Sequence, residues 1–189
     1  HQGLHPYSIP IGGSTAVGAL GYIAAYHEIV EQCLALAISP STIVCTSSSG
    51  GTHAGLVAGR AWLRALGTYK VLPRLLAIGV AKGVIAGFPS IHELASEALV
   101  LAGLPGEVTD DDIEVDGRWL GPDYAIPTEA SQKASVWAAH AGAWVLDDVY
   151  TAKGMAGLLG HADDGRWISN DDVIFIHTGG QPEVFVRHD

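Results

Sequence analysis

Short apolar runs recur along the chain, and each is followed by a turn or a polar segment. Runs of this kind predict strands that are buried inside a sheet. The predicted strands are residues 42–45, 75–80, 144–146 and 173–177. The hydrophobic pattern therefore places strands early and late in the chain and leaves the longer segments between them for helices.

Apolar residues recur at helical spacing in these longer segments. In the first of them the stripe is formed by Leu20, Ile23, His27, Val30 and Leu34. The predicted helices are residues 16–37, 56–66, 90–102, 128–141 and 151–159. Since strands and helices alternate, we predict an α/β fold with an open, mostly parallel twisted sheet and helices on both faces.

Two polar turns follow predicted strands. The stretch Thr46–Gly55 has the sequence TSSSGGTHAG and leads into a helix, so that free backbone amides and the positive end of the helix dipole meet at one point. Thr178–Gly180 follow the last strand. We expect an anion, most plausibly a phosphate, at the first turn. Because ligands of parallel sheets bind beyond the carboxyl ends of strands, we expect both turns to belong to a single site. An ordinary strand-to-helix turn remains the alternative for the first stretch.

Composition narrows the choice of partners. The net charge of −10 disfavours nucleic acid and anionic membranes as partners, and no apolar run reaches the roughly 18 residues of a membrane span. Cys33 and Cys45 are expected to be reduced core residues, which suits a cytoplasmic protein. The acidic segment 106–121 is expected to be a solvated loop, and the histidines show no spacing typical of a metal site, so we expect no metal.

Several of these stretches resemble one family. The chain is similar to the carboxyl-terminal half of the D-cysteine desulfhydrase and 1-aminocyclopropane-1-carboxylate deaminase family, which are pyridoxal-phosphate enzymes of the tryptophan-synthase-β fold type, or fold type II. The matching stretches are PYSIPIGGS at 6–14, GALGY at 18–22, SGGTHAGL at 49–56, LDDVYTAKGMAGL at 146–158 and IHTGG at 176–180. The resemblance implies that residues 1–189 form this half, with the larger cofactor domain and part of the small domain.

The resemblance also implies roles for individual residues. Pyridoxal 5′-phosphate would be the cofactor, and its phosphate would be held by Ser48, Ser49, Gly50, Gly51 and Thr52. Thr178 would face the pyridine nitrogen, where an uncharged hydroxyl favours β-elimination. Tyr124 and Tyr150 would line the substrate pocket as catalytic residues.

Simpler interpretations remain open for these side chains. Thr178 could be a turn or cap hydroxyl, and each tyrosine could pack with its hydroxyl at the surface. His53 is expected to be a core or cap histidine, and His177 a buried strand residue.

The family's Schiff-base lysine belongs to the amino-terminal half, which this sequence does not contain. Lys70, Lys82, Lys133 and Lys153 do not match its context. We therefore expect a complementary chain that carries the lysine and an oligomer of such heterodimer pairs. Because the chain opens on His1, inside the domain, a split gene or a cleaved precursor is expected.

The resulting hypothesis is a subunit of a pyridoxal-phosphate lyase that catalyses β-elimination or deamination of a small amino acid such as D-cysteine. The alternative is a non-catalytic regulatory subunit that binds pyridoxal phosphate or another phosphate ligand. A Rossmann-type nucleotide-binding module is disfavoured because no Gly-x-Gly-x-x-Gly fingerprint is present. Asp123 and Asp148 depart from the family's motifs, and an acidic pocket rim would disfavour an anionic substrate side chain such as that of cysteate.

Overall fold

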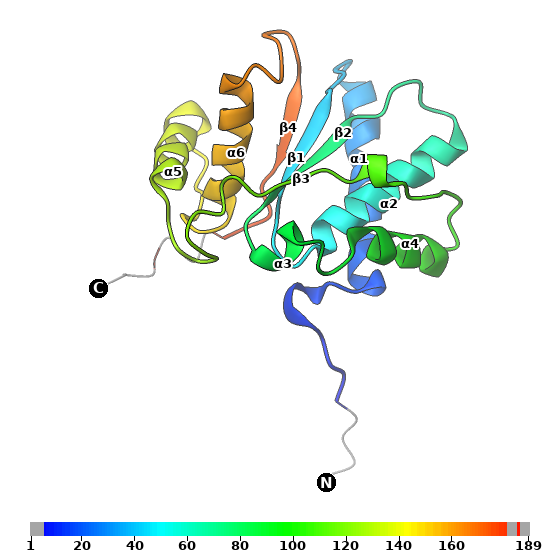
Figure 1. Cartoon of the computed structure of the whole chain (residues 1–189). Helices are drawn as coiled ribbons and strands as arrows, with labels where there is room; N and C mark the ends of the chain where they lie inside the picture. The colour runs from blue at the N-terminus through cyan, green and yellow to red at the C-terminus, as the bar shows by residue number, and fades with distance from the viewer. Residues whose placement is uncertain (1–5, 181–184, 186–189) are drawn as a thin grey trace.

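A four-stranded sheet lies at the centre of the chain (Figure 1). The computed structural model describes residues 6–180 and residue 185. All strand pairs are parallel, in the order β3-β2-β1-β4. The strands are β1 (Thr42–Ser47), β2 (Arg74–Gly79), β3 (Val115–Asp116) and β4 (Val173–Ile176). The predicted α/β fold with a parallel sheet is confirmed.

The helices lie in two layers on opposite faces of the sheet. On one face are α1 (Ala16–Ala35), α2 (Gly51–Leu66) and α4 (Ile91–Ala102), and on the other are α5 (Glu129–Gly142) and α6 (Thr151–Asp163) (Figure 1). Short helical turns complete the described elements: η1 (Ile11–Gly13), α3 (Lys82–Ile85) and η2 (Asp110–Asp112). None of the helices in the described ranges is both long and apolar enough to cross a bilayer.

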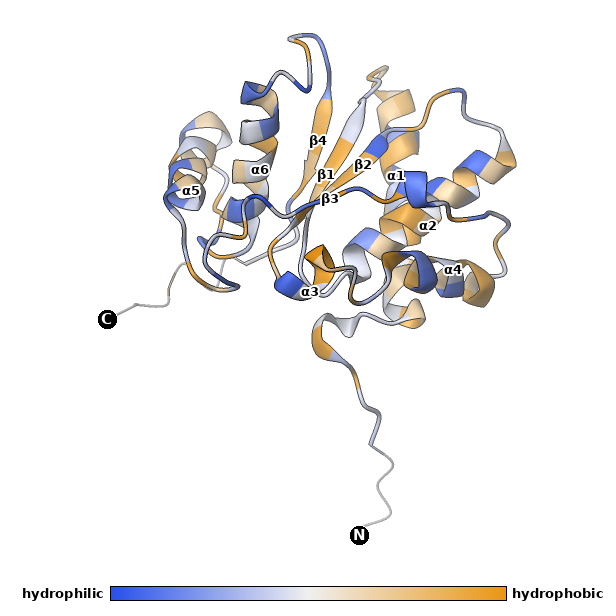
Figure 2. Cartoon of the chain, in the orientation of Figure 1, coloured by the Kyte–Doolittle hydropathy of each residue, from blue (hydrophilic) through white to orange (hydrophobic). Residues whose placement is uncertain are grey.

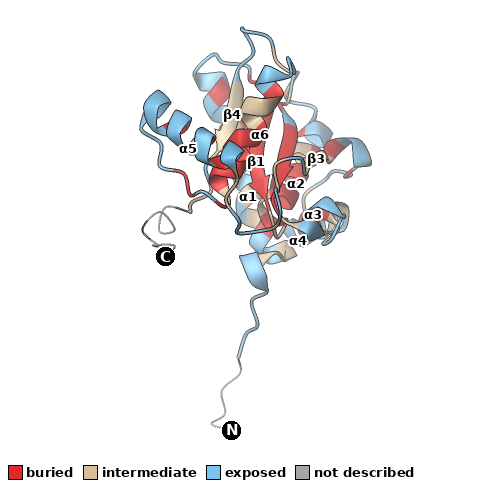
Figure 3. Ribbon diagram, turned by 60° about the vertical axis from the view of Figure 1, so that its left-hand side comes forward, coloured by how far each residue is buried: buried red, intermediate tan, exposed pale blue. Residues whose placement is uncertain are grey.

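Alternate residues of each strand enter two different cores, as the period of a pleated strand requires. Ile43 and Cys45 of β1 pack in the cluster formed with α1, α2 and α4, whereas Val44 packs on the side of α6. Figure 2 shows the hydrophobic colouring along β1, β2 and β4, and Figure 3 shows β1 and α2 buried at the centre. Strands covered on both faces explain why the sequence shows apolar runs rather than alternation.

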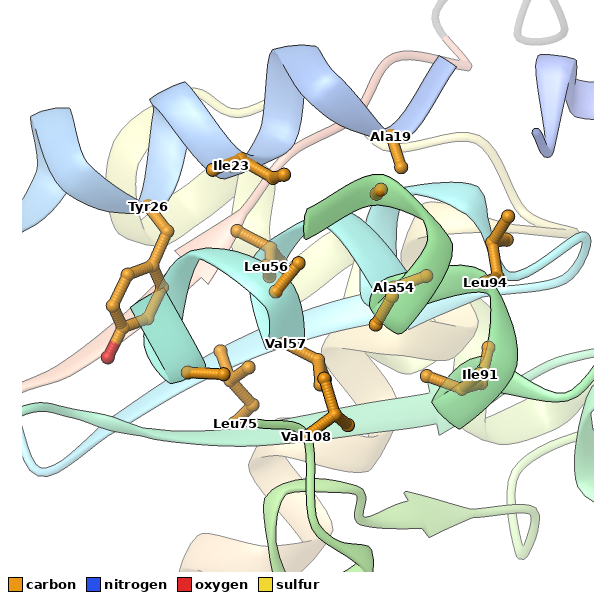
Figure 4. Close-up of a cluster of buried hydrophobic side chains, with 14 of the residues drawn as sticks. Ala19, Ile23, Tyr26, Ala54, Leu56, Val57, Leu75, Ile91, Leu94 and Val108 are labelled. Atoms are coloured by element: carbon orange, nitrogen blue, oxygen red, sulfur yellow. The ribbon is translucent and has the colours of Figure 1, made fainter. Parts of the chain in front are cut away.

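Helices α1 and α2 run side by side in the same direction. A Cβ on Gly55 would lie 2.4 Å from the carbonyl oxygen of Ala19, and one on Gly59 would lie 3.0 Å from that of Ile23. Figure 4 shows Ala19, Ile23 and Tyr26 of α1 facing the helices beneath. The glycines let the two backbones approach. Since the contacts advance in the same order along both helices, from Gly51 with Ser14 to Gly59 with Ile23, both helices begin at the same end of the sheet, where β1 leads into α2.

Helix caps agree with the sequence. Thr15 accepts a hydrogen bond from the backbone N–H of Gly18, and Ser90 accepts one from that of Glu93. These bonds satisfy amides that the helices leave free at their first turns.

Three expectations about local structure were wrong. Residues 144–146 form no strand, because the chain there leaves α5 in an irregular conformation and only Leu146 is buried. The final strand is half-buried rather than buried, since β4 is an edge of the described sheet. It also ends at Ile176, so that His177 is an exposed residue after the strand.

The acidic segment is not uniformly solvated. Asp112 is only 3% exposed, and its carboxylate accepts hydrogen bonds from Arg60 and Arg64 of α2. Glu114 pairs with Arg166 at 2.6 Å. From the sequence, this charge run was expected to face water. Arg60 and Arg64, which are distant in the sequence, pair with the Asp112 carboxylate and offset the free-energy cost of burying its charge. Asp110 and Asp111 are exposed, as expected.

Candidate functional site

A cavity of about 460 Å³ lies beyond the carboxyl ends of β1 and β4. Its walls come from segments far apart in the sequence, including η1, α1, the turn after β1 and the residues after β4. The lining residues are Ile11, Gly12, Tyr22, Ser48, Ser49, Thr52, Tyr124, Asp147, Val149, Tyr150, Thr178 and Gly180. The structure therefore brings the two predicted polar turns to one place.

The turn after β1 leaves backbone amides free at the start of α2. Gly50 adopts a left-handed conformation with φ of 86°, which a residue with a side chain rarely adopts, and no side chain caps the helix. The first intrahelical bond joins the N–H of Ala54 to the carbonyl of Gly50 at 2.9 Å. The N–H groups of Gly51, Thr52 and His53 thus precede the hydrogen-bonded turns, which is the arrangement that binds anions.

The η1 turn closes over this anion-binding turn. Gly12 has a φ of 71°, and a Cβ there would lie 2.0 Å from the Oγ of Ser49. Ser14 stands beside Gly51, whose added Cβ would be 3.1 Å from the Ser14 Oγ. Among the described residues that line the cavity there is no lysine or arginine, so that an anion at the start of α2 would be bound by backbone amides and hydroxyls.

Thr178 presents a buried hydroxyl to the site. Its Oγ1 makes no hydrogen bond of standard geometry to any residue of the described ranges, although it lies close enough to the Tyr150 hydroxyl to offset part of the rise that burial causes in the pKa of that phenol. Thr178 also lines the cavity, next to Gly180 of the same turn. A buried hydroxyl without a partner costs free energy, so this oxygen is a natural contact for a ligand.

The two predicted tyrosines lie at the same cavity but in different environments. The Tyr150 hydroxyl donates a hydrogen bond to the carbonyl of Thr46 at 3.0 Å, and burial raises the pKa of Tyr150 well above its ordinary value. Tyr124 is 48% exposed, and its backbone N–H donates to the carboxylate of Asp123. The Tyr150 side chain is therefore held in place in the cavity wall, and its hydroxyl is protonated. Tyr124 lies at the open side of the cavity.

Asp147 is a cavity residue that the sequence interpretation missed. It is 1% exposed and accepts hydrogen bonds from the backbone N–H groups of Val149, Tyr150 and Thr151 and from the Thr151 hydroxyl. An aspartate shortly before a helix is a recognisable cap, and this signal lay in the stretch after Leu146. Asp147 fixes the backbone that carries Tyr150.

No lysine reaches the cavity wall. Lys153 is buried, but its ammonium donates to the carbonyls of Leu120 and Asp123 at 2.7 and 3.0 Å, and burial lowers its pKa. Lys82 pairs with the Asp123 carboxylate on the surface. The described ranges also contain no group of three or more His, Cys, Asp or Glu side chains that could hold a metal.

Asp123, Asp148 and His177 lie outside the cavity lining. Asp148 is exposed and Asp123 is bound to Lys82, so that neither carboxylate forms the acidic rim considered from the sequence. His53 is fully buried in α2 and neither ring nitrogen has a partner within the described chain, so the expected core position is confirmed. Burial lowers the pKa of His53 to about 4.

This constellation is that of a phosphate-bearing cofactor site at the carboxyl edge of a parallel sheet. Residues 2–179 match the family described as pyridoxal-phosphate dependent enzyme, and the chain belongs to that family. The buried, unpartnered hydroxyl of Thr178 and the uncapped amides of α2 in one cavity fit such a group, which carries a phosphate at one end and a ring nitrogen acceptor at the other.

Two curated proteins and one solved structure illustrate which members of the family the chain is similar to. D-cysteine desulfhydrases of Salmonella typhi and Salmonella choleraesuis (strain SC-B67) are each 35% identical over 189 residues, which is 99% of this chain and 54% of theirs. A crystal structure described as that of an ACC deaminase homologue superposes with a TM-score of 0.79 at 31% identity, over 95% of this chain and 50% of that one. The chain thus spans about half the length of the curated relatives it matches.

Proposed function

We propose that this chain supplies the cofactor pocket of a pyridoxal-phosphate lyase that acts on a small amino acid with a β-leaving group, such as D-cysteine. Ser48, Ser49, Gly50, Gly51 and Thr52 would hold the cofactor phosphate through amides and hydroxyls. Thr178 would contact the ring nitrogen. When bound, the cofactor supplies an electron-withdrawing ring that stabilises negative charge on the substrate α-carbon.

The observation that carries this proposal is the Thr178 hydroxyl, buried without a partner in the cavity where α2 begins. A threonine hydroxyl is uncharged and need not hold a proton on the ring nitrogen, unlike a carboxylate. The resulting electronic state suits elimination, in which the leaving group departs as the α-proton is lost. The similarity to D-cysteine desulfhydrases supports the same reaction class.

The tyrosines supply hydroxyl groups for the substrate. Burial raises the pKa of Tyr150, so its hydroxyl stays protonated at neutral pH. Its one proton is donated to the Thr46 carbonyl in this structure, so it would have to exchange that bond to donate to a substrate carboxylate or a departing group. Tyr124, at the open side of the cavity, can contact the substrate as it enters. Asp147 keeps the Tyr150 backbone in place through its bond to the Tyr150 N–H at 2.6 Å.

A complementary chain would supply the reactive lysine and complete the pocket in an oligomer of heterodimer pairs. Support comes from the absence of lysine among the described cavity-lining residues. We propose that the complementary chain would cover β4, which pairs with β1 on one side only within the described sheet. Beside it lies an apolar groove of about 410 Å³ lined by Trp137, Trp144, Leu146, Met155, Leu158, Val173, Phe175 and His177.

A second candidate is a regulatory subunit that binds pyridoxal phosphate or a similar ligand without turnover. The observation favouring it is that Lys153, the buried lysine, is bound to two backbone carbonyls and does not line the cavity.

One experiment separates the candidates. The native assembly is purified through a tag on this chain, its polypeptides are identified by mass spectrometry, and the assembly is assayed for sulfide and pyruvate release from D-cysteine. A lyase subunit is expected to yield a yellow complex with a lysine-bearing companion and measurable turnover. A companion without turnover on D-cysteine or other β-substituted amino acids would favour the regulatory candidate. Recovery of this chain alone would contradict the complementary-chain proposal.

A further inference from the structure

The motif GALGY at 18–22 has no part in the site as proposed so far, yet its tyrosine lines the cavity. Tyr22 and Tyr26 lie one turn apart on α1 but differ in their contacts. The Tyr26 hydroxyl is buried and donates to the carbonyl of Pro73 at 2.9 Å. The Tyr22 side chain is half-buried, and its hydroxyl makes no hydrogen bond to any residue of the described ranges.

Glycines on α2 place Tyr22 against the start of that helix. A Cβ on Gly55 would lie 2.5 Å from the Cβ of Tyr22, so any larger residue would push Tyr22 away. The same glycine spacing brings Ser14 to Gly51 and Tyr26 to Gly59, and these pairs show that α1 and α2 run in the same direction. Tyr22 is thus set within about one turn of Thr52, where the free amides of α2 begin.

The direction of the side chain follows from helix geometry. Side chains of an α-helix lean towards its N-terminus, because the Cα–Cβ bonds tilt that way. The N-terminus of α1 lies beside that of α2, so Tyr22 leans towards the anion-binding turn rather than away from it. Its place in the cavity wall with Gly12, Ser49 and Thr52 agrees with this direction.

We propose that the Tyr22 hydroxyl donates a hydrogen bond to the phosphate of the ligand held at the start of α2. The inference rests on the proposed cofactor site and adds a residue to it from a different helix. A phosphate monoester carries close to two negative charges and three acceptor oxygens, and the described residues that line the cavity include no lysine or arginine to meet them. A phenol is a strong neutral donor, and a hydrogen bond to a charged acceptor is about twice as strong as one between neutral groups.

The test uses the full chain and pyridoxine 5′-phosphate, which lacks the aldehyde and therefore cannot react with surface lysines. Affinity is measured by isothermal titration calorimetry for the wild type, Tyr22→Phe and Tyr26→Phe, and inorganic phosphate is titrated as a competitor. Tyr22→Phe is expected to weaken both ligands by a similar factor, about tenfold, with an unchanged melting temperature. Tyr26→Phe, the matched control, is expected to lower the melting temperature and leave both affinities unchanged.

The outcomes are distinguishable. Equal affinities of the wild type and Tyr22→Phe for pyridoxine 5′-phosphate would overturn the inference and leave the cofactor site intact. A loss confined to pyridoxine 5′-phosphate, with inorganic phosphate unaffected, would place Tyr22 against the ring and also overturn it. A wild-type chain that binds neither ligand would remove the proposed site itself, and this inference with it.

Discussion

Thr178 shows how a single side chain can be arranged for a ligand at the expense of stability. Its Oγ1 is buried and makes no hydrogen bond of standard geometry within the described part of the chain. We expect Thr178→Val, which keeps the shape and removes the hydroxyl, to raise the free energy of unfolding of the ligand-free chain by roughly 1 kcal/mol. The same change is expected to weaken pyridoxine 5′-phosphate about three- to tenfold, because one neutral hydrogen bond is lost. Urea unfolding and calorimetric titration measure the two effects.

The matched control for this prediction is Thr46→Val. The Thr46 Oγ1 is also buried and unpartnered within the described residues, but it faces Gly154 of α6 and is not part of the cavity wall. We expect both variants to be more stable than the wild type. Only Thr178→Val is expected to bind pyridoxine 5′-phosphate more weakly. If Thr178→Val bound the ligand as tightly as the wild type, the hydroxyl would be a turn feature, as the simpler interpretation of the sequence allowed.

The buried His53 predicts how the stability of the chain depends on pH. Burial lowers its pKa from 6.5 to about 4, so the folded chain keeps the ring neutral while the unfolded chain protonates it below pH 6.5. Stability is therefore expected to fall as pH decreases from about 6.5 towards 4, by on the order of 2 kcal/mol between pH 7 and pH 5.

The contribution of His53 is isolated by comparing pH profiles. Urea unfolding of the wild type and His53→Leu at pH 7, 6 and 5 should show a smaller loss for the variant, whatever its absolute stability. Parallel profiles would mean that another group causes the dependence. His161 is the group to examine next, since burial lowers its pKa as well.

At the scale of elements, the contact between α1 and α2 depends on glycine. Gly55→Ala is expected to destabilise the chain by at least about 2 kcal/mol, because its Cβ would lie 2.4 Å from the backbone oxygen of Ala19. The control is Gly21→Ala on α1, where an added Cβ meets nothing within 4 Å. That variant should be stabilised by about 0.5–1 kcal/mol through helix propensity. Thermal unfolding of the two variants checks this; destabilisation of similar size in both would mean that propensity does not govern Gly21.

The elements that local patterns specify were predictable. The apolar runs identified β1, β2 and β4, and the helical spacing of apolar residues identified α1 and α4, because burial patterns repeat within a few residues. The strand expected at 144–146 was wrong, since a short apolar run also fits a loop that packs one leucine against α5 and α6. Asp112 was misjudged because its arginine partners lie 48 and 52 residues away.

The candidate site was likewise predictable from the sequence only in part. Its two polar turns could be found from their positions after strands, because parallel strands bring their carboxyl ends to one edge. The cap formed by Asp147 is a local signal that was overlooked, because its partners lie within four residues. The place of Tyr22 in the cavity wall could not be found from the sequence, since it depends on how α1 and α2 meet in space. Assignment of roles to Tyr124, Tyr150 and Thr178 came from resemblance and stays a prediction.

At the scale of the molecule, the sheet of the described residues has two edge strands, the two-residue β3 and the longer β4. Strand β4, of sequence VIFI, is covered by helices on both faces, yet it pairs with β1 only within the described residues. An apolar edge strand without a charge, proline or bulge is an exposed template for pairing, which natural proteins normally cover. Trp137 and Trp144, 44% and 47% exposed, border the groove beside it. We propose that the complementary chain covers this edge.

Hydrogen–deuterium exchange compares this edge in the isolated chain and in the native assembly. In the isolated chain the β4 amides that point away from β1 should exchange rapidly, whereas β1, which is paired on both sides, should be protected. In the assembly, protection of β4 and the Trp144 segment is expected to rise while β1 is unchanged. Trp144→Ser should weaken the assembly about tenfold or more, and Val100→Ser, at an exposed apolar position on α4, should not. If β4 exchanged at the same rate in both samples, the complementary chain would have to bind elsewhere, because a strand that gains a neighbour cannot keep its outward amides open to solvent.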